Sequence, residues 1–271
     1  MLNPVERDGA SLVQVKHTGP VTVVIMNQPE RLNALSPTLL RHLRIALTAA
    51  AENAQCRCVV LTGNGRGFSA GADLSYFRAS DDPDVATDLG ATLHQTYHPI
   101  IRLLREMEKP VITAVNGVAA GAGCNIALAG DIVLAGRSAS FIQAFIKLGL
   151  IPDAGGTWLV PRLIGRARAL QWMMSGDALD PHTAEQWGLI NGVYNDEQLM
   201  SEAMSLACRM AAQPTRALAG IKTLIDLSTE QDLEAQLGSE ARRQSELGYG
   251  RDAREGIAAF LEKRPAVFAG E

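Results

Sequence analysis

The chain has 271 residues, of which 47% are hydrophobic and 20% charged. This composition excludes a disordered protein, and the length is sufficient for an α/β domain with further helices. A net charge of −4 argues against a nucleic-acid partner, and no apolar run approaches the ~20 residues of a membrane span. The N-terminal segment lacks a signal-peptide pattern and the four cysteines form no Cys-x-x-Cys pair, so we expect a cytoplasmic protein with reduced thiols.

The first part of the chain predicts two strands, a helix and a third strand. Apolar and β-branched residues indicate strands at Leu12–His17 and Val21–Met26. Ser36 followed by proline is typical of a helix start, and leucines then recur at helical spacing. The apolar run Cys58–Thr62 predicts the next strand, which leads directly into a glycine-rich segment.

Two glycine-rich segments, 65–74 and 116–124, each follow a predicted buried strand, the second of these being Pro110–Val115. Small side chains leave backbone N–H groups exposed in such loops. The second loop leads into an apolar helix, Gly121–Ala129, whose positive dipole end would lie behind its amides. Two such loops can direct two N–H donors at one developing oxyanion. Neither has the Gly-Lys-Ser/Thr of a phosphate loop or a clean dinucleotide-binding fingerprint.

The sequence between the two glycine-rich segments predicts a polar loop and a long helix. Ser80–Asp84 is expected to be a mobile loop, and the helix after it is expected to end near Met107. His94 and His98 stand four residues apart on this helix, a spacing that could serve a metal. No third ligand of the right type is apparent, so a pocket-lining or surface role is favoured and no metal is expected.

A strand at Ile132–Ala135 precedes the segment 149–157, where Asp153 is the single carboxylate among glycines and apolar residues. Apolar neighbours disfavour the charged form of the carboxyl, so the pKa of Asp153 should rise. A base with a raised pKa suits proton abstraction beside a carbonyl. The alternative is a helix N-cap, because Asp before Gly-Gly-Thr and an apolar run can satisfy free N–H groups.

The last third of the chain is predicted to be almost entirely helical. A compositional change near Pro181–Asn191 marks the predicted boundary between a core, residues 1–190, and a helical region, residues 191–271. The predicted helices are Arg166–Met174, Thr183–Gly188, Glu197–Ala212, Arg216–Leu227, Leu233–Leu247 and Ala253–Lys263.

Four motifs, in order and at characteristic separations, resemble the crotonase, or enoyl-CoA hydratase/isomerase, superfamily. They are Phe68–Leu74, Asn116–Gly123, Gly130–Ile132 and Gly149–Thr157, and the similarity extends over nearly the whole chain. The resemblance implies an α/β fold with a spiral core of ββα repeats, followed by a C-terminal helical region for trimerisation. It also implies an acyl-CoA thioester substrate, with coenzyme A as part of the substrate and no separate cofactor.

The resemblance further implies which residues form the site. By position, the oxyanion hole would consist of the N–H groups of Ala72 and Ala122. Gly121 is the alternative to Ala122, because the family usually has glycine at that second position. The other residues expected to line the acyl-CoA site on this basis are Asn33, Ala34, Ala70, Gly71, Asp73, Leu74, Val118, Gly121, Asn125, Phe145 and Pro152.

The coenzyme A moiety needs a small basic patch, for which Arg31 and the terminal pair Lys263–Arg264 are the candidates. In the family the C-terminal helix reaches the nucleotide bound by a neighbouring subunit. The resemblance therefore implies a homotrimer or hexamer, with Phe260 and Lys263 near the adenosine end of a neighbour's coenzyme A. The alternative for Lys263 is a solvated cation at a helix end.

Departures from the hydratase pattern favour isomerisation. Hydratases of this family add water with two glutamates, and the corresponding positions here hold Asn125 and Phe145. Asp153 stands where isomerase relatives carry a catalytic acid. One carboxylate suffices for a 1,3-proton shift, because it can remove the α proton and return it at the γ carbon. The segment around Asp153 is most similar to isomerases of phenylacetate catabolism, which act on the ring epoxide 1,2-epoxyphenylacetyl-CoA and can shift enoyl-CoA double bonds.

Three other functions stay open as alternatives. A hydratase of the same family is the first. A haloaroyl-CoA dehalogenase would have its nucleophilic Asp at the position of Asp153, but it pairs that residue with a tryptophan where this chain has Phe145. A non-catalytic RNA binder or scaffold of this fold would call for a basic stripe, which the first helix lacks. Asp73 and Asp131, near predicted helix ends, are interpreted as loop anchors rather than proton-transfer groups.

Overall fold

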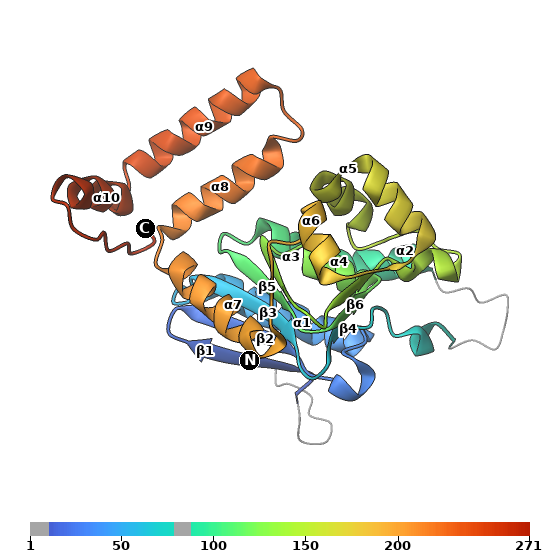
Figure 1. The fold of residues 1–271 in the computed structure, drawn as a ribbon. Coiled ribbons are helices and arrows are strands. Elements are labelled where there is room, and N and C mark those ends of the chain that lie inside the picture. Colours follow the sequence, from blue (N-terminus) through green and yellow to red (C-terminus); the bar gives the residue numbers. More distant parts are fainter. Residues whose placement is uncertain (1–10, 79–87) are drawn as a thin grey trace.

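The computed structural model describes residues 11–78 and 88–271. The loop predicted at Ser80–Asp84 lies outside these residues. The described part is a mixed α/β fold with two sheets, as the sequence predicted (Figure 1). No helix in residues 11–78 and 88–271 has the length and apolar character needed to cross a membrane.

The larger sheet has six strands in the order β1-β2-β3-β5-β7-β10. Its first two strands form an antiparallel pair and the others run parallel to β2. The central strands β3 and β5 are buried along their whole length, which fits the continuous apolar runs that predicted them. The strands are β1 (Val13–Thr18), β2 (Val21–Met26), β3 (Cys58–Gly63), β5 (Val111–Val115), β7 (Ile132–Gly136) and β10 (Gly192–Tyr194).

The smaller sheet has four short strands in the order β4-β6-β8-β9. Each of β4, β6 and β8 directly follows a strand of the larger sheet, so the chain alternates between the two sheets and winds into a spiral. The sequence had placed β4 and β6 in loops, because two or three residues are too few to show an alternating pattern. The strands are β4 (Gly67–Ser69), β6 (Val118–Ala120), β8 (Ser140–Ile142) and β9 (Ala178–Leu179).

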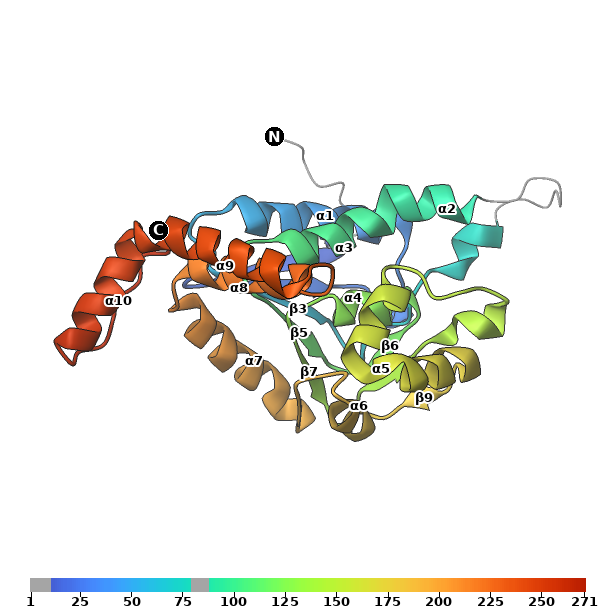
Figure 2. The same cartoon turned by 90° about the horizontal axis from the view of Figure 1, so that it is seen from above.

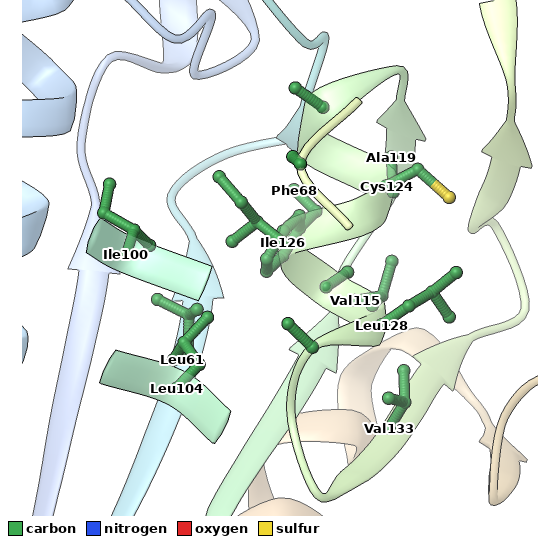
Figure 3. Close-up of a cluster of buried hydrophobic side chains, with 14 of the residues drawn as sticks. Leu61, Phe68, Ile100, Leu104, Val115, Ala119, Cys124, Ile126, Leu128 and Val133 are labelled. Carbon is green, nitrogen blue, oxygen red and sulfur yellow. The ribbon is translucent and has the colours of Figure 1, made fainter. Parts of the chain in front are cut away.

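Helices cover both faces of the larger sheet. Helix α1 (Pro37–Glu52) begins where predicted, with Ser36 Oγ accepting from Leu39 N at 3.1 Å. With α3 (His98–Glu106) and α4 (Ala122–Leu128) it encloses the main hydrophobic core. Figure 3 shows part of this core, including Leu61 of β3 and Ile126 of α4. On the other face, α7 (Asp196–Ala211) buries small and apolar residues at helical spacing, namely Leu199, Ala203, Ala207 and Ala211.

The long helix predicted before Met107 contains an irregular turn. It starts as α2 (Leu89–Thr92), widens into a π-helical turn, η3 (Leu93–Tyr97), and continues as α3. The N–H of His98 donates to the carbonyl of Leu93, five residues back. A single π turn inside an α-helix is frequently found at a functional site.

The helix predicted at Arg166–Met174 is the second half of α5 (Gly156–Ser175). Gly165 has non-helical backbone angles, so α5 consists of two helical pieces that meet at this residue. The first piece was missed, because its Gly-Gly-Thr start and Pro161 weaken a sequence-based helix assignment. The remaining short helices are η1 (Pro29–Arg31), η2 (Leu74–Arg78), η4 (Ala144–Leu148) and α6 (Pro181–Trp187).

Helices α8 (Thr215–Leu227), α9 (Leu233–Gly248) and α10 (Arg251–Leu261) form a C-terminal arm. In both views α10 lies at the opposite end of the molecule from α2 (Figures 1 and 2). Asp131 ties the arm to the core, since its Oδ2 accepts from Lys222 Nζ of α8 at 3.0 Å and from Val111 N of β5 at 2.8 Å. This confirms the prediction that Asp131 is a structural anchor.

Candidate active site

A cavity of about 550 Å³ opens between α2, the π turn, η4 and the loop before α5. Its wall is mostly apolar, with few polar groups, and Asp153 is the one carboxylate among the described residues that line it. Such a cavity suits an apolar ligand held by a small number of placed polar groups. The lining residues are Ala72, Leu74, Leu89, Thr92, Leu93, Tyr97, His98, Phe145, Leu148, Leu150, Ile151, Pro152, Asp153, Ala154, Gly155 and Thr157.

Asp153 is held on a tight turn between η4 and α5. Its carbonyl accepts from Gly156 N at 2.8 Å, and the next two residues, Ala154 and Gly155, have positive φ angles of 45° and 78°. Gly155 is the N-cap of α5, and no side chain makes a capping hydrogen bond there. The N-cap interpretation of Asp153 is therefore wrong, because the left-handed pair of residues separates its carboxyl from the first turn of the helix.

Two buried amide side chains support the turn from behind. Asn125 Nδ2 of α4 donates to the carbonyl of Asp153 at 2.8 Å, and Gln143 Nε2 donates to Asn125 Oδ1 at 2.8 Å. Both side chains belong to fully buried residues. A Cβ on Gly156 would come within 2.4 Å of Asn125 Nδ2, so only glycine lets α5 start this close to the amide. Asn125, predicted to line the acyl-CoA site, thus lies behind the wall and positions the backbone of Asp153.

The surroundings of Asp153 change its acidity in the direction predicted from the sequence. Burial raises the pKa of the carboxyl from 3.8 to about 6, with a backbone hydrogen bond opposing the rise. Asp153 Oδ1 is buried and has no hydrogen-bond partner within the described chain. A carboxylate with a pKa near 6 can accept a proton at neutral pH and return it.

The backbone at Ala72 presents a free amide on the cavity side. A single parallel bridge joins Leu35 and Ala72, and it uses Leu35 N to Gly71 O at 2.8 Å and Asp73 N to Leu35 O at 3.3 Å. Gly71 O and Ala72 N belong to one trans peptide group, whose C=O and N–H point in opposite directions, so Ala72 N faces away from this bridge. Ala72 lines the cavity, and within residues 11–78 and 88–271 its N–H finds no acceptor.

The second predicted amide, Ala122 N at the start of α4, has no acceptor within the described residues, and Ala122 itself is buried and not part of the cavity wall. Ala122 is the first residue of this helix, where N–H groups lack partners inside the helix. Gly121 is different, since its N–H donates to Ile142 O at 2.8 Å, and this bond removes the predicted alternative to Ala122. The loops carrying the two amides are in contact: a Cβ on Gly71, whose φ is +88°, would come within 2.7 Å of Ala120 O.

Arg31 and Asp73 form an ion pair beside the Ala72 loop. Arg31 Nη1 lies 2.9 Å from Asp73 Oδ2, and Arg31 Nη2 donates to Asp73 Oδ1 at 3.1 Å. Asp73 Oδ1 also accepts from Ser75 N at 3.2 Å. Asp73 therefore anchors the loop, as interpreted from the sequence. Neither residue lines the cavity, and the role predicted for Arg31 in coenzyme A binding stays a prediction.

The other predicted binding residues divide into wall and support. Leu74, Phe145 and Pro152 line the cavity together with Ala72 and Asp153. Ala34, Ala70, Gly71, Val118 and Gly121 belong to the loops and strands next to it and are not part of its wall. Asn33 is fully buried, with Nδ2 donating to Gly67 O at 2.8 Å and Oδ1 accepting from Gln28 N at 2.8 Å. The Asn33 amide shapes the loops and is not directed into the cavity.

Two neighbouring residues of the wall, Tyr97 and His98, were not among the predicted site residues. His98 lines the cavity, which confirms the pocket-lining interpretation, and its Nδ1 lies 3.3 Å from Nδ1 of His94. Burial, His94 and Arg102 lower the pKa of His98. In the part of the chain that the structure describes, no group of three or more His, Cys, Asp or Glu side chains could hold a metal ion. The sequence predicted the long helix that carries these two residues. Only the fold shows that this helix lies next to Asp153.

The two predicted C-terminal contacts lie outside the cavity. Phe260 is 83% exposed near the end of α10, and Lys263 follows that helix with a positive φ of 56°. Arg264 pairs with Glu255 at 2.7 Å, whereas no ion pair of Lys263 is found in the described chain. Since α10 and α2 lie at opposite ends of the molecule, these residues lie far from the cavity of the same chain (Figure 1).

Comparisons with known proteins agree with this geometry. Residues 16–271 match the family described as Enoyl-CoA hydratase/isomerase. The chain is 46% identical to 1,2-epoxyphenylacetyl-CoA isomerase of Escherichia coli (strain K12), over 93% of this chain and 95% of that protein. It is 38% identical to 2,3-dehydroadipyl-CoA hydratase of the same strain, over 92% and 95% of the two chains. The crystal structure of an enoyl-CoA hydratase from Bacillus anthracis superposes with a TM-score of 0.88 at 31% identity, covering 96% of this chain and 100% of that one. The family match over nearly the whole chain, together with the two-sheet spiral, shows that this protein belongs to the enoyl-CoA hydratase/isomerase family.

Proposed function

We propose that the protein is an acyl-CoA isomerase that shifts a double bond or rearranges a ring epoxide in a coenzyme A thioester. The observation that carries this proposal is the single carboxylate in the described wall of the cavity, Asp153, with its raised pKa. Support comes from the 46% identity to an enzyme named 1,2-epoxyphenylacetyl-CoA isomerase. Phenylacetate catabolism in the cytoplasm is the setting that we propose on the same basis.

The proposed reaction uses one base and two amide donors. The Asp153 carboxylate removes a proton from the carbon α to the thioester, and the electron pair moves onto the thioester oxygen. The N–H groups of Ala72 and Ala122 hold that oxygen as the negative charge develops, which is where preorganised donors contribute most. For a simple enoyl substrate, Asp153 then returns the proton at the γ carbon and the double bond lies one position closer to the thioester.

Hydration is the second candidate, because several relatives are named hydratases. Water addition needs one group to activate water and one to supply a proton. Hydratases that the sequence resembles carry glutamates where this chain has Asn125 and Phe145. Here Asn125 is committed to the Asp153 turn and Phe145 is a buried part of the wall. The protein should therefore show only trace hydration.

Asp153→Asn tests the proposal, because it keeps the shape of the side chain and removes the base. Turnover of trans-3-hexenoyl-CoA and of 1,2-epoxyphenylacetyl-CoA should fall about a hundredfold or more, with little change in acyl-CoA affinity. Asp177→Asn, at an exposed position outside the cavity, is the matched control. Product analysis by mass spectrometry in deuterated water should show part of the original α proton at the γ carbon. Wild-type rates in Asp153→Asn, or robust hydration of crotonyl-CoA by the unaltered protein, would refute the proposal.

We also propose that coenzyme A is bound between subunits of a homotrimer or hexamer. The cavity of a subunit lies far from its own Phe260 and Lys263, so a contact from α10 to coenzyme A requires a neighbour. The arm also exposes large apolar side chains, including Ile225 at 62% and Leu233 at 70%. Exposed apolar surface of this kind is typical of an interface.

A further inference from the structure

Tyr97 is a polar residue in the wall of the cavity that the proposed function does not use. It is 3% exposed, lines the cavity with Asp153 and ends the π turn η3. In a regular α-helix, consecutive side chains point about 100° apart. The wider π turn reduces that angle, so two consecutive side chains can belong to the same wall, as Tyr97 and His98 do.

No hydrogen bond from the Tyr97 hydroxyl to another described residue is found, Asp153 included, and the hydroxyl oxygen is not among the fully buried unpaired atoms, so it keeps some exposure. A hydroxyl that keeps some exposure in a cavity can bond to water there, and a ligand that displaces this water has to replace its bond. Burial, and then the charges of Asp153 and Asp73, raise the pKa of the Tyr97 phenol, so it stays a protonated donor at any physiological pH. Asp153 acts on it more strongly than Asp73 does, which is consistent with a position near the base.

Three polar groups already have tasks in the proposed function. Asp153 takes the carbon-bound proton, and the amides of Ala72 and Ala122 hold the thioester oxygen. A plain enoyl chain offers no second acceptor, so Tyr97 would stay unpaired when such a chain fills the cavity. A substrate with an oxygen atom on its acyl group would pair it.

We propose that Tyr97 donates a hydrogen bond to an oxygen atom carried by the acyl group, and that this contact makes oxygenated acyl groups, such as a ring epoxide, the favoured substrate class. The inference rests on the proposed isomerase function. It adds a residue that contacts substrate and a reason for the enzyme to discriminate between a ring epoxide and an unsubstituted enoyl chain. Sites that hydrogen-bond a substrate oxygen discriminate against analogues without it more strongly than apolar pockets discriminate by size.

Tyr97→Phe tests the contact, because it removes only the hydroxyl oxygen. Two substrates of similar ring size separate the effects: 1,2-epoxyphenylacetyl-CoA, which carries the oxygen, and 1-cyclohexenylacetyl-CoA, which does not. For the epoxide, kcat/KM should fall about tenfold or more, the effect of losing one buried hydrogen bond. For the cyclohexenyl thioester it should stay within about twofold. Tyr194→Phe, on β10 and away from the cavity, is the matched control, and thermal unfolding verifies that both variants fold.

Each other outcome overturns the inference. An equal loss with both substrates would mean that Tyr97 acts on Asp153 or on packing, and the absence of loss with either would mean that the hydroxyl makes no contact. A selective loss in His98→Gln, with none in Tyr97→Phe, would assign the donor to the histidine. Failure of the proposed function is a different result: Asp153→Asn would then keep its rate with both substrates, whatever Tyr97→Phe does.

Discussion

At the scale of single residues, the acidity of Asp153 links activity to pH. Its pKa near 6 in the folded protein means that the base is ionised above that pH and protonated below it. We expect kcat/KM for isomerisation to rise with pH along a limb with a midpoint of about 6 and to be level above it. A rate profile between pH 5 and 8 checks this, and a midpoint near 4 would show that the carboxyl is not desolvated.

The same shift predicts an effect on stability. The folded pKa is raised, from 3.8 to about 6, so the folded state binds this proton more tightly than the unfolded state does. The buried carboxylate therefore destabilises the fold above pH 6, by at most about 3 kcal/mol, and this penalty disappears as the pH falls toward 4. Asp153→Asn should raise the unfolding midpoint at pH 8 and lose that advantage near pH 4.5. Denaturant unfolding at both pH values measures it, and an advantage that grows at low pH would contradict the sign.

The amide of Asn125 offers a test of positioning at residue scale. Asn125→Asp keeps the shape but replaces the donor facing the Asp153 carbonyl, 2.8 Å away, with an acceptor. We expect kcat to fall about tenfold with KM nearly unchanged, and stability to fall by about 1–3 kcal/mol. Asn195→Asp, at the start of α7, is the control. A change in KM alone would indicate that Asn125 contacts substrate instead.

At the scale of elements, the start of α4 allows removal of one amide without loss of the helix. Ala122 is the first helical residue, the position where proline is best tolerated, and the preceding Gly121, with φ of 51° and ψ of −128°, lies outside the α region that a following proline disfavours. Ala122→Pro should lower kcat by a factor of about 10² to 10³, the usual effect of losing one oxyanion donor. Leu233→Pro, at the first residue of α9, is the control for proline in this helix position. Unchanged turnover in Ala122→Pro would exclude this amide from the site.

The elements that could be predicted from sequence are those with a long, regular pattern. The larger sheet apart from β10, together with α1, α3 and the arm helices, follows from apolar runs and helical spacing, and Asp153 was identified because a lone carboxylate among apolar residues is unusual. Strand β10 was missed, because it has three residues and lies in the part of the chain predicted to be almost entirely helical. The smaller sheet was missed because its strands have two or three residues. Asn125 was misplaced, and Tyr97 was overlooked, because both depend on which elements meet in space. Sequence spacing shows neither the buried bond from Asn125 to the Asp153 carbonyl nor the shared cavity wall.

At the scale of the whole molecule, the separation of the arm from the cavity predicts how assembly supports binding. If Lys263 contacts coenzyme A across a subunit boundary, Lys263→Ala should weaken coenzyme A binding about threefold to tenfold while turnover at saturation stays nearly intact. Titration calorimetry measures the affinity. Lys147→Ala, on η4, is the control for the loss of one positive charge.

The mass in solution is an independent check. Light scattering should give three or six times the 29.0 kDa of one chain. A monomer mass would exclude the contact between subunits and leave Lys263 as a solvated cation at the end of α10. In that case α8 to α10 would need another partner to cover their exposed apolar side chains.

The bond from Asn125 to the carbonyl of Asp153 also restricts the order in which substitutions could accumulate during divergence. A glutamate at position 125, as in two-carboxylate relatives, would bring its oxygens toward a carbonyl that now accepts a hydrogen bond, in a fully buried position. The turn at Asp153 would have to be rebuilt first. Position 125 and the turn at Asp153 can be exchanged between a one-carboxylate and a two-carboxylate relative in either order. The intermediate should fold when the turn is exchanged first and be damaged when position 125 is exchanged first.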